Sequence, residues 1–176
     1  MNFNINKKTA IVCGSTQGIG KCTAIELAKN GANIVLVARN EEKLRHVASE
    51  LDTTQGQKHH WLVADFSNPT ELETTLQKYI ADGGDAHILV NNTGGPKGGN
   101  IIDATVEEFY SAFTQHLICN HILVQHLSPL MKKNNYGRII NVISTSVKQP
   151  LNGLGVSNTI RGAVANWSKT LANELG

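Results

Sequence analysis

Short apolar runs alternate with amphipathic segments along almost the whole chain. Each run is apolar at successive positions, which is typical of a strand buried on both faces of a parallel sheet. A strand with one exposed face would instead carry a polar residue at every second position. The five runs that predict strands occupy residues 9–14, 33–39, 59–66, 86–92 and 137–144.

The segments between these runs carry apolar residues at helical spacing. In one of them, Leu44, Val47 and Leu51 share one face of the expected helix. Gly31 follows the first such segment and fits the C-terminal stop of a helix. The predicted helices cover residues 18–30, 40–51, 67–80, 105 to about 133, and from a start within 153–158 to the end of the chain.

Two helix starts carry recognisable capping signals. Asn68 precedes Pro69, which predicts an N-cap and a first helical residue, with Glu71 reaching back toward the cap. Thr105 and Glu108 have the spacing of a capping box, so we expect the fourth helix to begin there.

Strands that alternate with helices predict a single α/β domain over residues 1–176. Because crossover helices cover both faces of a parallel sheet, the expected architecture is a three-layer α/β/α, doubly wound sheet of the Rossmann type. By analogy with that fold, the expected strand order is 3-2-1-4-5. The sequence contains no internal repeat and no linker-like stretch.

Composition and charge are ordinary for a folded domain and exclude several classes of partner. Hydrophobic residues make up 40% of the chain, and the formal net charge of +2 is too small to indicate binding to nucleic acid or a membrane surface. No apolar stretch has the length of a membrane span, and the first residues lack a secretion signal. Cys13, Cys22 and Cys119 are widely spaced, so we expect reduced thiols and a cytoplasmic protein.

Seven histidines raise the question of a metal site, but their spacing argues against one. His59 and His60 are adjacent and would face opposite ways on a strand. His116, His121 and His126 are five residues apart, so on a helix they drift around the axis. We therefore expect scattered histidines and no metal.

The segment "CGSTQGIG" at residues 13–20 joins the first predicted strand to the first predicted helix. Glycines allow the main chain to approach a ligand closely, and the helix N-terminus offers free N–H groups and a positive dipole end to a diphosphate. This position predicts dinucleotide binding, although any tight turn also favours glycine. The expected cofactor contacts in this segment are Gly14, Ser15, Gln17, Gly18, Ile19 and Gly20.

The end of the second predicted strand bears on the choice of cofactor. Enzymes that use NAD usually carry an acidic residue there, whereas this chain has Ala38 followed by Arg39. A guanidinium pairs with a 2′-phosphate, so NADP(H) is favoured over NAD(H), unless Arg39 is only an exposed loop cation. Ser15 is placed to add a hydrogen bond to the same phosphate. Asp65 is placed to reach the adenine, or alternatively to cap the next helix.

The sequence resembles the short-chain dehydrogenase/reductase family in several stretches along the chain. The similar stretches are "CGSTQGIG", "ADF" at 64–66, "NNTG" at 91–94 and "GRIINVIS" at 137–144, and "NNTGGP" is similar to a 3-oxoacyl-[acyl-carrier-protein] reductase-like subgroup. The resemblance implies hydride transfer from a nicotinamide cofactor to a carbonyl, and homodimers or homotetramers packed through the fourth and fifth helices. It also implies that further residues line the cofactor cleft, although paired asparagines are common turn formers. These are Asp65, Phe66, Asn91, Thr93 and Gly94.

The resemblance also places four catalytic positions, of which only one keeps the residue of the family. The family uses Asn, Ser, Tyr and Lys. The serine corresponds to Ser144, while Ser157 stands at the tyrosine position and Arg161 at the lysine position. His116 stands at the asparagine position, with Asn120 as the alternative one helical turn later.

These departures change the chemistry that the site can perform. An aliphatic hydroxyl such as that of Ser157 is a much weaker acid than a phenol, and Arg161 stays charged and cannot shuttle a proton. Together with Ser144, these residues can still hydrogen-bond a substrate oxygen and bind a carboxylate or phosphate. The proton for a reduced carbonyl would then come from water, or from His116 if that side chain faces the cleft.

Three functions remain open at this stage. The first is an NADP(H)-dependent reductase of a small carbonyl or 3-oxoacyl substrate, with a modified site. The second is a catalytically silent NADP-binding module or oligomeric pseudoenzyme, and the third is a structural oligomer in which Ser157 and Arg161 form a polar stripe in a subunit contact. Family members continue through two more strands and a substrate-covering segment. We therefore expect the fifth strand to be an uncovered apolar edge, either because the chain is a fragment or because a partner chain covers it.

Overall fold

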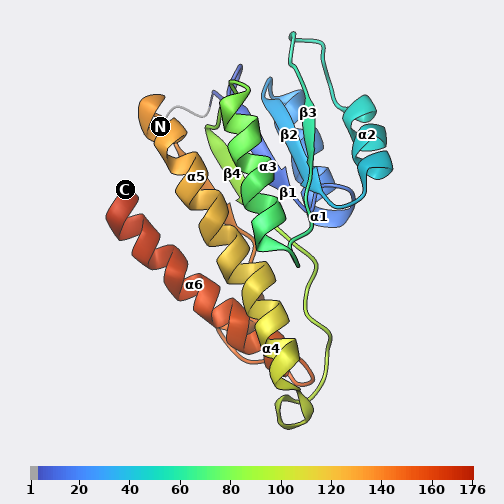
Figure 1. The fold of residues 1–176 in the computed structure, drawn as a ribbon, viewed down its shortest axis with the longest axis vertical. Helices are drawn as coiled ribbons and strands as arrows, with labels where there is room; N and C mark the ends of the chain where they lie inside the picture. Colours follow the sequence, from blue (N-terminus) through green and yellow to red (C-terminus); the bar gives the residue numbers. More distant parts are fainter. Residues whose placement is uncertain (1–3) are drawn as a thin grey trace.

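The computed structural model of the chain describes residues 4–176 and is built on one parallel sheet (Figure 1). Within these residues the sheet has five strands in the order β3-β2-β1-β4-β5, which confirms the predicted order 3-2-1-4-5. All neighbouring strands are parallel. The strands are β1 (Thr9–Cys13), β2 (Asn33–Ala38), β3 (His60–Val63), β4 (Ile88–Asn91) and β5 (Arg138–Asn141).

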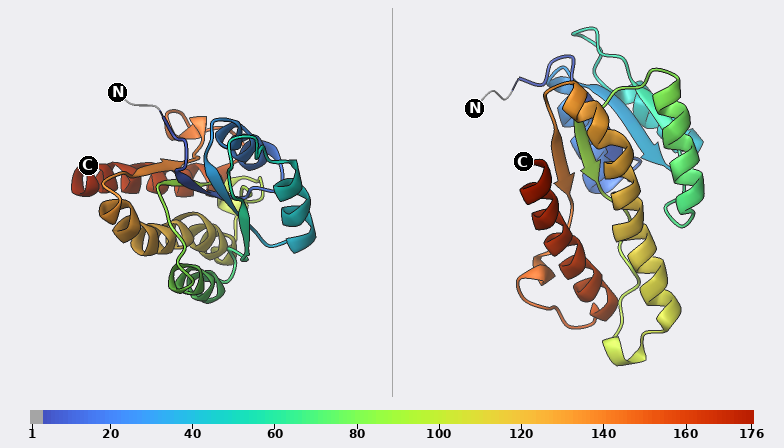
Figure 2. Two further views of the ribbon diagram at one scale, coloured as in Figure 1. Left: turned by 90° about the horizontal axis from the view of Figure 1, so that it is seen from above. Right: turned by 60° about the vertical axis from the view of Figure 1, so that its left-hand side comes forward.

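Helices cover both faces of this sheet, as expected for three layers (Figure 2). Helices α1 and α2 pack on one face, and α3, α5 and α6 pack on the other. The helices are α1 (Gly18–Lys29), α2 (Glu41–Glu50), α3 (Pro69–Ala81), α4 (Val106–Phe113), α5 (Cys119–Lys133) and α6 (Gly155–Leu175), with short 3₁₀ turns at Ile101–Asp103 and Thr145–Val147.

Strand β1 shows why its sequence is continuously apolar. Its successive side chains point to opposite faces, so Ile11 and Cys13 enter the core under α3 and α5 while Ala10 and Val12 enter the core under α1 and α2. All four are fully buried. Burying a side chain the size of Ile11 contributes about 1.5–3 kcal/mol to folding, so the central strand anchors both cores.

The helix ends follow the local signals in the sequence. The Asn68 side chain accepts a hydrogen bond from the Glu71 backbone N–H at 3.2 Å, and Pro69 is the first residue of α3. Thr105 and Glu108 form a complete capping box at the start of α4. These contacts fix where the helices begin and therefore how their faces meet the sheet.

The fourth predicted helix is not one regular α-helix, which corrects the prediction of a continuous helix to about residue 133. A π-helical turn at Thr114–Ile118 separates α4 from α5. Such a turn inserts an extra residue into the helix and rotates the side chains around it, and these turns are frequent at functional sites. His116 lies within the turn.

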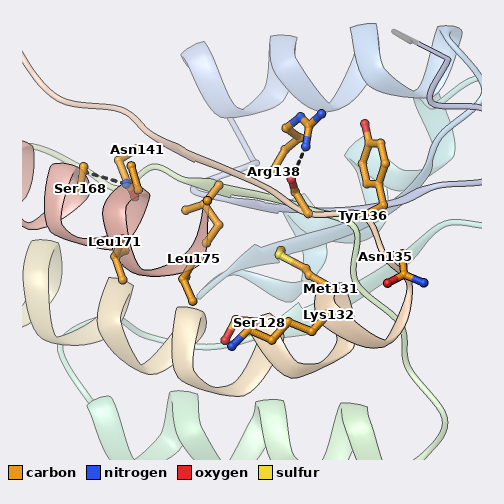
Figure 3. Close-up of a pocket in the computed structure, with 14 residues that line it drawn as sticks. Ser128, Met131, Lys132, Asn135, Tyr136, Arg138, Asn141, Ser168, Leu171 and Leu175 are labelled. Carbon is orange, nitrogen blue, oxygen red and sulfur yellow. Dashed lines mark hydrogen bonds between the residues drawn. The ribbon is translucent and has the colours of Figure 1, made fainter. Parts of the chain in front are cut away.

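Strand β5 lies at the outer edge of the sheet, and Ile140 on it is 50% exposed. A groove of about 750 Å³ runs beside it, between the ends of α5 and α6. Figure 3 shows Met131, Leu171 and Leu175 around this groove, with Asn141 hydrogen-bonded to Ser168 at its far end. The apolar edge that the sequence predicts is therefore present. Within residues 4–176, no helix combines the length and hydrophobicity that crossing a membrane requires.

Candidate active site

The turn after β1 presents bare main chain at the start of α1. Gly14 and Gly18 have φ of +57° and +54°, a region that favours glycine. A Cβ at Gly14 would come within 2.7 Å of Asn92, and a Cβ at Gly20 would overlap the Gly14 carbonyl oxygen. The N-cap residue Gln17 makes no side-chain capping bond, so the first N–H groups of the helix are left for a ligand.

A cleft of about 540 Å³ opens at this turn, at the carboxyl ends of the parallel strands. Most of the predicted cofactor contacts line it: Gly14, Gln17, Gly18, Ile19, Arg39, Asp65, Phe66, Thr93 and Gly94. The other residues that line it are Thr16, Val37, Ala38, Ala64, Ser67, Asn92, Gly95 and Gln115. Residues at the carboxyl ends of four strands, β1, β2, β3 and β4, therefore line this one cleft.

Three predicted contacts do not line the cleft. Ser15 is fully buried, and its hydroxyl donates to the Val37 carbonyl at 3.4 Å, which corrects the expectation that it meets a cofactor phosphate. Asn91 is buried and donates from Nδ2 to Asn141 Oδ1 at 2.7 Å, so it ties β4 to β5. Gly20 is buried behind Gly14, where it permits the tight turn.

Asn92 lies in the stretch 91–94 that the resemblance implies lines the cofactor cleft, but its own contacts are not predicted from the sequence. Its Nδ2 donates to the carbonyl oxygens of Cys13 and Gly14 at 3.2 and 3.3 Å. It thereby fixes the glycine turn from the neighbouring strand. The only signal for it in the sequence is its place in "NNTG" at 91–94.

Arg39 and Asp65, which the sequence predicts to contact the adenosine part of a cofactor, line the same cleft and carry opposite charges. Arg39 is exposed, and within residues 4–176 its guanidinium has no hydrogen-bond or ion-pair partner. The pKa of Asp65 is lowered, first by the hydrogen bond that its carboxylate accepts from the Ser67 N–H and to a smaller extent by the charge of Arg39. Asp65 lines the cleft and holds the turn before α3, whereas the N-cap of α3 itself is Asn68, which corrects the expectation that Asp65 caps this helix.

Ser144, Ser157 and Arg161 lie where β5 ends and α6 begins. The Ser144 hydroxyl oxygen accepts a hydrogen bond from the Ser146 N–H at 3.1 Å and caps the turn at Thr145–Val147. Helix α6 packs against this turn and carries Ser157 and, one turn later, Arg161. Arg161 is buried and donates from Nη1 to the Val142 carbonyl at 2.8 Å.

His116 does not line the main cleft. It lines a neighbouring cavity of about 350 Å³ that shares Gly95 and Gln115 with the cleft. Its side chain is 1% exposed, and neither ring nitrogen has a hydrogen-bond partner. Burial, and then the charge of Arg161, lower the pKa of His116 to about 4. At neutral pH the ring is therefore uncharged and holds no imidazolium proton to donate, which weakens its expected role as the acid.

The alternative to His116 is also buried. Asn120 lies on α5, and its Oδ1 has no hydrogen-bond partner. Ser146 is buried in the same way, with an unpartnered hydroxyl. Unpaired buried polar groups are costly, so water or a ligand would be expected to complete the hydrogen bonding of these atoms.

The two buried cysteines offer no second reactive centre. Burial raises the pKa of the Cys119 thiol to about 11 and moves that of Cys13 still further upward. Both thiols are therefore protonated at neutral pH and inert as nucleophiles. Among the residues that the structure describes, no group of three or more His, Cys, Asp or Glu side chains is arranged to hold a metal ion.

Known proteins are similar to this chain in fold and in sequence over nearly its whole length. The crystal structure of L-sorbose reductase from Gluconobacter frateurii complexed with NADPH and L-sorbose superposes with a TM-score of 0.92 at 32% sequence identity. The match covers 99% of this chain and 66% of that one. The NADPH-dependent reductase BacG of Bacillus subtilis (strain 168) is 28% identical over 172 residues, covering 97% of this chain and 66% of BacG.

A human relative is similar over a comparable stretch of this chain. The "inactive hydroxysteroid dehydrogenase-like protein 1" of Homo sapiens is 31% identical over 167 residues, covering 94% of this chain and 50% of that protein. This chain thus spans between half and about two thirds of the length of these relatives. The sequence profile of the short chain dehydrogenases matches residues 8–176. The chain therefore belongs to the short-chain dehydrogenase/reductase family.

Proposed function

We propose that the chain binds NADP(H) and uses it to reduce a carbonyl compound. The observation that carries the proposal is the cleft in which the bare glycine turn and the unpaired Arg39 guanidinium both lie. A diphosphate is stabilised by free N–H groups at a helix start, and a 2′-phosphate by a guanidinium. The NADPH in the L-sorbose reductase structure and the name of BacG support the same cofactor.

The residues around the cleft fit the parts of this cofactor. Gly14 to Ile19 would hold the diphosphate against the start of α1, and Arg39 would hold the 2′-phosphate. Asp65 and Phe66 would lie by the adenine, and Thr93 and Gly94 would line the path toward β5. NAD(H) lacks the group that Arg39 would bind, so it is the weaker ligand in this proposal.

When bound, the nicotinamide supplies a hydride to the carbonyl carbon, and the carbonyl oxygen gains a proton to become a hydroxyl. Ser144 and Ser157 would hydrogen-bond that oxygen, and Arg161 would add a fixed positive charge beside it. Water would provide the proton, because Ser157 is a weak acid and His116 is uncharged at neutral pH. A 3-oxoacyl compound is one candidate substrate.

A second candidate function is a silent NADP-binding module. It is favoured by two observations: no phenol stands at the position of Ser157, and Arg161 already donates a hydrogen bond to the main chain. A protein of this kind would bind the cofactor, and its site beside β5 would recognise an anion without turnover. The human relative's name is consistent with such a loss.

Loss of NADPH absorbance with a panel of carbonyl compounds separates these two functions. The panel would include acetoacetyl-coenzyme A, a ketose and simple ketones. The proposed reductase oxidises NADPH with at least one of them, and Ser144→Ala lowers its turnover. The control Ser49→Ala, on the exposed face of α2, leaves turnover unchanged. Thermal stabilisation by NADPH without any turnover would instead establish the silent module, and equal turnover in Ser144→Ala would remove Ser144 from the site.

The exposed apolar face of α4 supports the proposal that the chain forms homodimers or homotetramers. Val106, Tyr110 and Phe113 recur at helical spacing on one face, and Tyr110 is 70% exposed. Ile118, at the end of the π turn that follows α4, is also partly exposed. A second copy of the chain would cover this surface. The contact would be formed by α4, α5 and α6, which correspond to the fourth and fifth helices predicted from the sequence.

We also propose a cellular compartment for the protein and a cover for the edge of β5. Cys13, Cys22 and Cys119 are unbridged, which supports a reducing compartment such as the cytoplasm. The exposed edge of β5 supports the proposal that further strands cover it, supplied by the rest of a longer chain or by a partner chain. The mass of the natural product, measured by mass spectrometry, distinguishes these two sources.

A further inference from the structure

Arg161 is a buried cation without a counter-ion in the protein. Arg161 is only 9% exposed, and its guanidinium donates a hydrogen bond to a main-chain carbonyl, that of Val142, at 2.8 Å. Within residues 4–176, no carboxylate forms an ion pair with it. Buried charges in proteins are usually paired, because removing an unpaired charge from water opposes folding.

The groups packed around Arg161 do not supply the missing negative charge. His116, on the π turn that faces α6, is uncharged at neutral pH. Ser144 and Ser157 carry neutral hydroxyls, and both ring nitrogens of His116 lack hydrogen-bond partners. The site is therefore positive by one charge and holds hydrogen-bonding groups without partners.

The phosphates of the proposed cofactor would be held elsewhere in the fold. The diphosphate would lie at the turn after β1, and the 2′-phosphate at Arg39 after β2. Arg161 lies on α6 and contacts the segment after β5, which is separated from β1 by β4 in the sheet. An anion paired with Arg161 would therefore not be one of the phosphates of the cofactor.

Building on the proposed function, we propose that the substrate is an oxo acid whose carboxylate pairs with Arg161 while Ser144 and Ser157 hydrogen-bond its reacting carbonyl. A guanidinium offers parallel N–H groups that match the two oxygens of a carboxylate. A carboxylate carries one charge and balances one arginine, whereas a phosphate monoester carries nearly two and calls for a second cation. In the reaction the carboxylate is unchanged, NADPH is oxidised, and the ketone gains a hydride and a proton from water.

The test compares charged and uncharged forms of the same ketones. NADPH oxidation is measured with pyruvate, acetoacetate and levulinate and with their methyl esters, alongside dihydroxyacetone phosphate and dihydroxyacetone. For at least one acid, KM is expected to be about tenfold lower than for its ester. In Arg161→Gln the KM of the acid is expected to rise until acid and ester differ by less than about twofold. Arg161→Lys is expected to keep part of the difference between the two KM values. The control Lys169→Gln, exposed on the same helix, keeps the whole difference.

Thermal stabilisation gives a readout that does not require turnover. With NADP⁺ saturating, the acids are expected to raise Tm of the wild-type protein and their esters are not. If Arg161→Gln does not fold, the wild-type comparison and Arg161→Lys decide the question. A preference for dihydroxyacetone phosphate over every acid overturns the assignment of a carboxylate. Equal KM values and equal Tm for acids and esters, with NADPH still stabilising the protein, overturn this inference alone. A lack of any stabilisation by NADPH overturns the proposed function itself.

Discussion

The side-chain amide of Asn92, at the end of β4, donates a hydrogen bond to the Gly14 carbonyl oxygen at 3.3 Å. The same nitrogen donates to the Cys13 carbonyl at 3.2 Å, so one side chain holds both main-chain groups that open the glycine turn. The shape of the cofactor cleft therefore depends on a contact between neighbouring strands as well as on the glycines.

Replacing Asn92 by Asp removes this donor while keeping the size of the side chain. A carboxylate would face two carbonyl oxygens, so we expect Tm to fall and the Kd for NADPH to rise roughly tenfold, the equivalent of about 1.4 kcal/mol. Binding is measured by calorimetry. Asn166→Asp, on an exposed part of α6, is the control and should leave Kd unchanged. An unaltered Kd in Asn92→Asp would show that the turn keeps its shape without this bond.

Gly20→Ala tests the close packing within the turn. Its Cβ would overlap the Gly14 carbonyl oxygen, a main-chain atom that cannot move freely. The free energy of unfolding is expected to fall by about 1–3 kcal/mol, measured by denaturant titration. Gly162→Ala serves as the matched control. Gly162 lies within helix α6, and a Cβ added there would meet no atom within 4 Å. That variant should be as stable as wild type or up to about 1 kcal/mol more stable.

His116 is expected to make the protein sensitive to mild acid. Its pKa is about 4 in the folded protein and 6.5 in the unfolded chain, so between these values the unfolded chain binds more protons. Stability therefore falls as pH drops below 6.5, by on the order of 3 kcal/mol in total at pH 4. In His116→Asn this contribution is absent, so the free energy of unfolding should fall over the same pH range by about 3 kcal/mol less than in wild type. His46→Gln, an exposed control, should follow wild type, and identical slopes for His116→Asn and wild type would contradict the burial of a neutral ring.

Arg39 is expected to decide between the two nicotinamide cofactors. In Arg39→Gln, the Kd for NADPH should rise about tenfold or more, because the 2′-phosphate loses its guanidinium, while the Kd for NADH stays the same. Fluorescence titration measures both constants. Arg138→Gln changes an exposed arginine that donates to the Gly137 carbonyl and should alter neither. An equal loss of NADPH and NADH binding in Arg39→Gln would mean that Arg39 supports the fold of the cleft and not the choice of cofactor.

Tyr110→Glu is expected to break the proposed homo-oligomer. A carboxylate in the middle of the apolar α4 face would be desolvated without a partner, so size-exclusion chromatography with light scattering should give a lower mass than for wild type. Thr53→Glu introduces the same charge at an exposed position away from α4 and should keep the wild-type mass. A wild-type protein that is already monomeric would remove this contact from the account.

The sequence predicts those features that depend on local patterns. Apolar runs and turn glycines locate the strands, and the strand order follows from the fold that they imply. The Asn68 cap and the capping box at Thr105 are predicted because their hydrogen bonds join residues three apart. The glycine turn is likewise a local feature, and its positive φ values at Gly14 and Gly18 agree with the cradle inferred from residue type.

Features that depend on distant contacts are missed. The π turn at Thr114–Ile118 inserts one residue, which apolar spacing does not reveal, and His116 within it lines a neighbouring cavity and not the cleft. Ser15 is adjacent to Gly14 in sequence, yet its hydroxyl turns to the Val37 carbonyl on another strand. Asn92 acts across the gap between β4 and β1, and Arg161 reaches a carbonyl beyond β5. Each of these depends on which strands are neighbours.

Calorimetric titration of the wild-type chain with NADPH and, separately, with NADH tests the central claim most directly. The account predicts saturable binding of NADPH at one site per chain, and a Kd for NADH that is about tenfold higher or more. Absence of any heat of binding with either nucleotide, from protein that is shown to be folded, would contradict it.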